Sequence, residues 1–268
     1  MNRHKYTEAN RKAWNQVAPI HRKSRNVDLA AAFGKSGYST LDKTITAKFQ
    51  QIGLCGKQVA QLGCNNGREI LSLVNLGARH GVGFDISDEV IKEARELNNV
   101  AGLDCTFVRS DVYAIGNEYD SIFDLVYISI GALTWMPDLP GFFAVASRLL
   151  KSGGKLVLYE QHPFQFMLAT ADEDEYDSAN PMKIAYSYFR QEVWENADGL
   201  DYYGKSKYKS EPSYCFTIKV SDIVNAMVGA KIILRELHEY PHDISNEFTH
   251  LQDRQLLPLS LLLVGEKS

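Results

Sequence analysis

The chain has 268 residues, of which 45% are hydrophobic and 23% are charged, an ordinary composition for a globular protein. Its formal net charge of -4 provides no basic field, which argues against a nucleic acid or a membrane surface as partner. The longest apolar run, at 256–264, is too short to cross a bilayer, and the polar N-terminus shows no secretory signal. These features predict a cytoplasmic protein.

The cysteines predict neither a metal site nor disulfides. Cys55, Cys64, Cys105 and Cys215 lie far apart, with no CxxC pair and no histidine at the spacing of a metal site. We therefore expect reduced structural thiols and no metal ion.

The first part of the chain is polar and mostly helical in pattern. Apolar residues recur at helical spacing between 8 and 17, and Pro19 is expected to end or bend this helix. A second helical stretch is predicted at 39–52, with Gly53 as its stop signal. We interpret residues 1–55 as an N-terminal helical cap.

From residue 57 the pattern changes to alternating strands and helices. The strand candidates are near-continuous apolar runs, as expected for strands covered by helices on both faces. They lie at 58–63, 81–86, 106–111, 123–129 and 155–161, with helical patterns at 88–98 and 142–150. Repeated strand–helix units predict an α/β fold with a doubly wound, mostly parallel sheet.

The alternation breaks after Pro163. Residues 164–218 hold an acidic stretch and aromatic-rich segments at 186–194 and 202–218, which we interpret as an inserted antiparallel lid over a substrate pocket. Such an aromatic edge is also compatible with a dimer contact, so a homodimer stays open. A helix capped by Ser221 and strands at 231–236 and 257–265 are expected to follow. Residues 56–163 and 219–268 would then form one Rossmann-like domain.

Three successive strand ends carry residues suited to a nucleoside ligand. Gly63 and Gly67 flank the first strand–helix turn, where glycines let the backbone approach a ligand at the carboxyl edge of the sheet. Asp85 closes the second strand, where a carboxylate accepts hydrogen bonds from ribose hydroxyls. After the third strand, Asp111 is placed to accept a hydrogen bond from the exocyclic amine of adenine, and Val112 to line the ring.

Together these residues resemble the motifs of the class I S-adenosylmethionine-dependent methyltransferase family, over roughly residues 57–165. The glycine-rich first motif is matched by Gly63-Cys64-Asn65-Asn66-Gly67, although Gln61 stands where the family usually has an acid. Asp85 matches the ribose-binding acid and Asp111 the adenine-binding acid. Residues 123–126 begin the fourth motif, and the turn at 149–156 is similar to the one that precedes the fifth strand.

The resemblance implies S-adenosylmethionine as cofactor, methyl transfer to a small-molecule acceptor, and a seven-stranded sheet. Its last strand, at 257–265, would run antiparallel between its neighbours. The N-terminal helix, with Trp14, is similar to the lid helix of members that act on small molecules, although Trp14 could also be core. The expected cofactor-binding residues are Gly63, Cys64, Asn65, Gly67, Arg68, Asp85, Ile86, Asp111, Val112, Ser129 and Trp14.

Candidate catalytic groups follow the fifth and sixth strands. They are Glu160, His162 and His242. A histidine titrates near neutral pH, so we hypothesise that His162 or His242 is a general base; the alternative for each is a hydrogen-bonded structural histidine. A non-catalytic module or partner subunit that binds S-adenosylmethionine remains the alternative to an enzyme.

Overall fold

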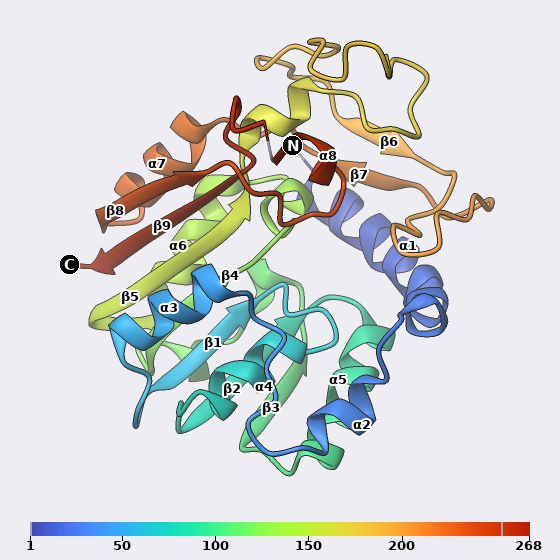
Figure 1. Ribbon diagram of the computed structural model, residues 1–268. Helices are drawn as coiled ribbons and strands as arrows, with labels where there is room; N and C mark the ends of the chain where they lie inside the picture. Colours follow the sequence, from blue (N-terminus) through green and yellow to red (C-terminus); the bar gives the residue numbers. More distant parts are fainter. Residues whose placement is uncertain (1, 253) are drawn as a thin grey trace.

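A single seven-stranded sheet organises the computed structural model, which describes residues 2–252 and 254–268 (Figure 1). The strand order is β3-β2-β1-β4-β5-β9-β8. Strands β1 to β5 pair in parallel, whereas β9 is antiparallel to both β5 and β8. The strands are β1 (Gln58–Leu62), β2 (His80–Asp85), β3 (Cys105–Arg109), β4 (Phe123–Ile128), β5 (Leu150–Gln161), β8 (Ile232–Tyr240) and β9 (Ser260–Lys267). The predicted sheet, including the insertion of its last strand, is confirmed.

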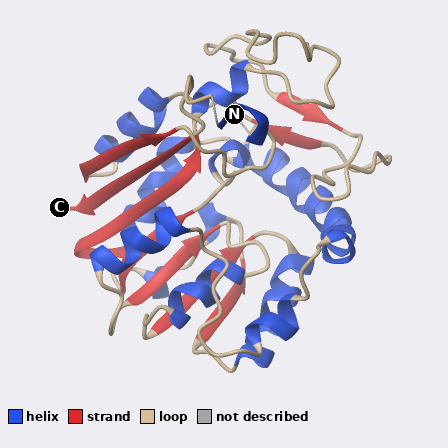
Figure 2. Ribbon diagram, viewed as in Figure 1, coloured by secondary structure: helices blue, strands red, loops and turns tan. Residues whose placement is uncertain are grey.

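Helices cover both faces of this sheet (Figure 2). Because successive side chains of a strand point to opposite faces, Val126 of β4 packs toward one set of helices and Leu125 toward the other. One face carries α6 (Leu139–Leu149) and α7 (Val220–Gly229), and the other carries α2 (Leu29–Phe33), α3 (Lys43–Ile52), α4 (Arg68–Asn75) and α5 (Asp88–Ala101). This burial on both faces explains the continuous apolar strand sequences.

Helix α1 (Arg3–Ser24) continues through Pro19. Of the two expected effects of this proline, ending or bending the helix, the first is therefore wrong. A proline inside a helix removes one hydrogen bond, here to the carbonyl of Asn15. Packing outweighs that loss, because Val17 and His21, on either side of the proline, are both buried. Basic residues in the last turn also stabilise the C-terminal end of the helix, because their positive charge is attracted to the negative end of the helix dipole.

Helix α7 begins one residue earlier than predicted, and Ser221 is not its cap. The first helical residue is Val220, and the cap is Lys219. The carboxylate of Asp222 accepts a hydrogen bond from the Lys219 N–H at 3.1 Å, which fixes the helix start at that point.

The 164–218 segment forms much less sheet than predicted. Among the described residues it has one pair of strands, β6 (Trp194–Asn196) antiparallel to β7 (Ser213–Cys215), and one isolated antiparallel bridge between Leu168 and Ile184. Between β6 and β7 the side chain of Asp201 accepts hydrogen bonds from the N–H groups of Gly204, at 2.8 Å, and Ser206, at 3.2 Å. Such local side-chain bonds compete with strand pairing and turn the chain instead.

Short elements complete the chain. They are the 3₁₀ turns η1 (Val112–Ala114), η2 (Asn117–Tyr119), η3 (Leu133–Trp135) and η4 (Pro163–Met167), and the helix α8 (Thr249–Gln252). Within the described ranges, none of the helices combines the length and the apolar character needed to cross a bilayer.

Candidate functional site

The turn between β1 and α4 is held by two glycines in the left-handed region. Gly63 and Gly67 have φ values of +69° and +76°, which favour a residue without Cβ. A Cβ on Gly67 would collide with the ring of Phe107 and lie 3.0 Å from the Cβ of Ala94. The Gly63 N–H donates to the carbonyl of Phe84 at 2.9 Å, so the turn lies against the end of β2.

Asp85, at the end of β2, binds the same turn. One carboxylate oxygen accepts the N–H of Asn65 at 2.8 Å, and the other accepts the N–H of Ser87 at 2.9 Å. Burial raises the pKa of Asp85, although its backbone hydrogen bonds oppose that shift. Asn65, with φ of 49°, and Cys64 complete the turn beside this carboxylate.

The third strand end lies next to the second. The Ser110 N–H donates to the carbonyl of Asp85 at 2.8 Å, and half-buried Ile86 follows. The carboxylate of Asp111 accepts the N–H of Tyr113 at 3.1 Å and so begins η1, whose first residue, Val112, is buried. The residues predicted from the three strand ends are thus placed along one carboxyl edge of the sheet.

A buried polar cluster joins the ends of β1 and β4. The side chain of Gln61, only 1% exposed, donates its amide N–H groups to Glu69 at 2.6 Å and to Ser129 at 2.9 Å. Its amide oxygen has no hydrogen-bond partner among the residues that the structure describes. Glu69 was not predicted, although its place in the first turn of α4, where helices favour acidic residues, was a signal.

An ion pair ties the N-terminal segment to the glycine turn. The guanidinium of Arg25 donates to the carboxylate of Glu93 in α5 at 2.8 Å. The buried side chain of Asn66 donates to the same carboxylate at 3.5 Å, so the glycine turn and the N-terminal segment share this acceptor. No local sequence signal indicates the Arg25–Glu93 pair, because 68 positions separate the two residues.

Helix α1 lies against the insert at β7 (Figure 1). The side chain of Asn10 donates to the backbone carbonyl of Tyr214 at 2.9 Å and accepts its N–H at 2.7 Å. Trp14, half-buried, packs edge-on against Trp135 of η3, with 5.5 Å between the ring centroids. The helix thus bridges the insert and the loop that follows β4.

The insert reaches the glycine turn through residues 200–204. The phenol of Tyr203 accepts a hydrogen bond from Arg68 at 2.9 Å. The ring Nε2 of buried His21 lies 2.9 Å from the carbonyl of Leu200, and burial lowers the pKa of this histidine. A neutral ring that donates from Nε2 fits this contact.

Glu160 lies at the end of β5 and is 3% exposed. Its carboxylate accepts backbone N–H groups of Gly131, of Leu133 at 3.2 Å and of Gln161 at 2.9 Å. Burial raises the pKa of Glu160 to about 7. The carboxylate therefore holds the loop between β4 and η3, which carries Ser129 at its start.

His162 is buried just beyond β5, with both ring nitrogens engaged. Its Nδ1 accepts the N–H of Phe164 at 3.1 Å, so Nε2 carries the proton and donates to Glu239 at 2.9 Å. Burial lowers the pKa of His162, with the hydrogen bond to Glu239 opposing. The nitrogen that could take a proton is thus occupied by a backbone donor.

His242 is half-buried in the loop after β8 and lies on a short hydrogen-bond chain. The phenol of Tyr159 donates to the carboxylate of Asp42 at 2.9 Å, and the Nε2 of His242 lies 2.8 Å from the same phenol. Because the tyrosine proton points to Asp42, Nε2 is the donor and Nδ1 is the basic nitrogen of the ring. Burial lowers the pKa of His242, so the ring is neutral near pH 7.

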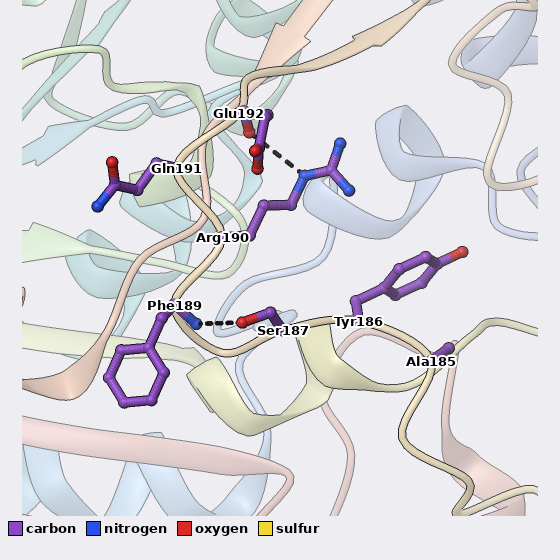
Figure 3. A pocket seen from close by; sticks show the side chains of 7 residues that line it. All are labelled: Ala185, Tyr186, Ser187, Phe189, Arg190, Gln191 and Glu192. Carbon is purple, nitrogen blue, oxygen red and sulfur yellow. Dashed lines mark hydrogen bonds between the residues drawn. The ribbon is translucent and has the colours of Figure 1, made fainter.

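A surface pocket of about 430 Å³ lies elsewhere, in the insert (Figure 3). One continuous stretch of chain lines it, with Arg190 bonded to the carbonyl of Glu192 and Ser187 to the N–H of Phe189. None of the predicted site residues is among its lining residues. The pocket is therefore distinct from the carboxyl edge described above.

Comparison with known proteins gives a family match for the central part of the chain. Residues 60–158 match the family model of a methyltransferase domain. The methyltransferase phqN of Penicillium fellutanum is 29% identical over 130 residues, which cover 47% of this chain and 36% of that protein. Cycloartenol-C-24-methyltransferase 1 of Oryza sativa subsp. japonica is 31% identical over 107 residues, covering 39% and 30%. The matched region spans about a third of the length of these two relatives.

Solved structures share the fold over most of the chain. A putative S-adenosylmethionine-dependent methyltransferase from Listeria monocytogenes superposes with a TM-score of 0.63 at 18% identity, covering 83% of this chain and 96% of that one. The geranyl diphosphate C-methyltransferase from Streptomyces coelicolor A3(2) superposes with a TM-score of 0.61 at 12% identity, and covers 98% of both chains.

Proposed function

We propose that the chain is a class I S-adenosylmethionine-dependent methyltransferase that methylates a small-molecule acceptor, because residues 60–158 match the family model of a methyltransferase domain. The observation that carries the proposal is the alignment of the glycine turn, Asp85 and Asp111 along one carboxyl edge, where open α/β sheets bind their ligands. The match of this region to a methyltransferase domain supports the cofactor.

The residues at this edge fit S-adenosylmethionine. Gly131 has a φ of +79°, and a Cβ placed on it would meet no described atom within 4 Å, so the β4 loop faces open space. Across from it, a Cβ on Gly63 would lie 3.4 Å from the Cβ of Ala132, so the two loops approach closely. The buried amide oxygen of Gln61, which has no partner in the part of the chain that the structure describes, lies at the same edge and needs a donor.

Each predicted residue has a task in this proposal. Asp85 binds the ribose hydroxyls, and Asp111 binds the adenine amine, with Ile86 and Val112 lining the ring. Arg68 and the backbone of the glycine turn hold the amino acid part, together with Ser129. S-adenosylmethionine supplies a methyl group activated on a sulfonium, so the protein's first tasks are to align the acceptor and to exclude water.

We propose that residues 1–55 form a cap and residues 164–218 a lid over that edge. The contacts between Trp14 and Trp135 and between Arg68 and Tyr203 support this role, because they bring cap and insert to the loops of the sheet. The side chains that α1, η3 and β7 bring together are aromatic, which suits an apolar or flat acceptor. The acceptor class is thus a small apolar or aromatic molecule.

For the proton that an oxygen or nitrogen nucleophile would release, we propose one of the two histidines as acceptor. His242 has the better placed nitrogen, since its Nδ1 is unprotonated, whereas Nδ1 of His162 accepts the Phe164 N–H. Glu160 acts by holding the β4 loop, because its carboxylate already accepts three backbone N–H groups.

The compartment and the assembly belong to the same proposal. All four cysteines are free, as expected for a protein of the reducing cytoplasm. A homodimer formed through the aromatic insert would be seen by light scattering as twice the mass of the chain.

Incubation with isotopically labelled S-adenosylmethionine and a panel of small apolar, phenolic and amine acceptors tests this function. We expect label in at least one acceptor and none in added RNA. Tight cofactor binding without any methylated product across the panel would instead favour the non-catalytic binding module.

A further inference from the structure

Gln61, Glu69 and Ser129 form a side-chain cluster at the ends of β1 and β4, and one buried hydrogen-bond acceptor in it has no donor among the described residues. The side-chain amide of Gln61 donates one N–H group to the carboxylate of Glu69 and the other to the hydroxyl of Ser129. Its own amide oxygen, buried with the rest of the side chain, has no partner among the described residues. A buried acceptor without a donor is costly, so the cluster is built to receive a ligand that donates.

The charge of the cluster indicates what kind of donor this is. Glu69 is half-buried, its hydrogen-bond partner here is a neutral amide, and it forms no salt bridge among the described residues, although the charge of neighbouring Arg68 interacts with it. Because Gln61 donates to the Ser129 oxygen, that hydroxyl keeps its own proton for another acceptor. The cluster therefore offers one carboxylate and one amide oxygen, the pair that suits a primary ammonium with its three N–H groups.

We propose that Glu69 and Gln61 bind the α-ammonium group of the cofactor's amino acid moiety, with Glu69 supplying the negative charge. The assignment rests on the proposed function. It puts the carboxylate on the first turn of α4, next to Arg68 and the glycine turn, while the strand position contributes only a neutral oxygen. The neutral side chain of Gln61 then connects the carboxylate of Glu69 to the end of β4 by a second hydrogen bond, to Ser129.

Binding of two product-like ligands to the purified full-length protein tests this assignment. The ligands are S-adenosylhomocysteine and its deamino analogue, in which hydrogen replaces the α-amino group. A charge-assisted contact predicts that Glu69→Gln weakens S-adenosylhomocysteine binding by about tenfold to a hundredfold, and that of the deamino analogue by about twofold at most. The double variant Gln61→Glu/Glu69→Gln returns a carboxylate to the cluster and should restore most of the preference for the amino group.

A matched control is Glu89→Gln, which makes the same charge change on an exposed side chain in the first turn of α5. It should leave both affinities within about twofold. If Glu69→Gln weakened the binding of both ligands equally, in protein with an unchanged melting temperature, the assignment of Glu69 would be wrong and the proposed function would still stand. Failure of the folded, unmodified protein to bind either ligand would overturn the proposed function and the assignment with it.

Discussion

Arg25 and Glu93 form an ion pair across the boundary between the N-terminal segment and α5, with only 9% and 8% of their side chains exposed. The same carboxylate accepts a hydrogen bond from Asn66 of the glycine turn. The pair thus connects the chain segment that follows α1 to the turn at the carboxyl edge. Its loss should weaken the packing of both segments.

Arg25→Met should cost about 3–5 kcal/mol in the free energy of unfolding, because it leaves the carboxylate of Glu93 buried without its partner. The matched control is Arg22→Met, whose ion pair with Glu96 is exposed at 55% and 43%, so that the loss should be at most about 1 kcal/mol. Urea unfolding of both variants measures the difference. Similar losses in the two variants would mean that burial does not strengthen the Arg25 pair.

Gly67→Ala should destabilise the protein more than an alanine at another left-handed glycine. At Gly102, with φ of +62°, a Cβ meets no described atom within 4 Å, so Gly102→Ala should cost only the backbone strain of about 1–2 kcal/mol. At Gly67 the collision with Phe107 adds about 1–3 kcal/mol. Denaturant midpoints of the two variants check this, and an equal shift would show that the ring of Phe107 moves away freely.

Glu160 should make stability depend on pH in a recognisable direction. Its folded-state pKa of about 7 lies above the ordinary value of 4.5, so the folded protein holds a proton that the unfolded chain releases. Stability from this group is therefore present at low pH and lost as the pH rises from about 4.5 to about 7, by up to about 3 kcal/mol.

Glu160→Gln removes that titration. The difference in unfolding free energy between the unmodified protein and the variant should thus change across this pH range in favour of the variant at the higher pH. Urea unfolding at several pH values measures it. A difference that is constant with pH would contradict the raised pKa.

Replacement of His242 and replacement of His162 should lower the kcat of methyl transfer to different extents. Removal of a general base typically slows turnover by about a hundredfold or more, so His242→Ala should lower kcat and leave cofactor affinity nearly unchanged. His162→Ala should act more weakly, because its Nδ1 already accepts the Phe164 N–H. Unchanged kcat in both variants would exclude a histidine base.

The sequence predicts the centre of the sheet well because β1, β2 and β4 are buried on both faces and read as apolar runs, as does the second half of β5 up to Leu158. It predicts the extent of the insert's antiparallel sheet less well, since only β6 and β7 pair as strands there, and Tyr214 of β7 also packs its ring against Tyr6 of α1. Aromatic content favours strands only where a partner strand is available.

The placement of the candidate residues at the carboxyl edge was predictable where a strand end or a turn fixes it, and not where residues meet only through the fold. Gly63, Gly67 and Asp85 follow from strand ends and turn chemistry. The hydrogen bonds that Glu160 accepts from the loop at 131–133, and the meeting of Tyr203 with Arg68, depend on the folded chain and leave no local pattern.

Calorimetric titration with S-adenosylmethionine, and separately with S-adenosylhomocysteine, tests the central claim most directly. We expect both to bind the folded protein with micromolar affinity, and binding to be lost in Asp85→Ala because the ribose loses its carboxylate acceptor. No heat of binding with either compound, in protein shown by circular dichroism to be folded, would mean that the glycine turn is only structural and that the proposed function is wrong.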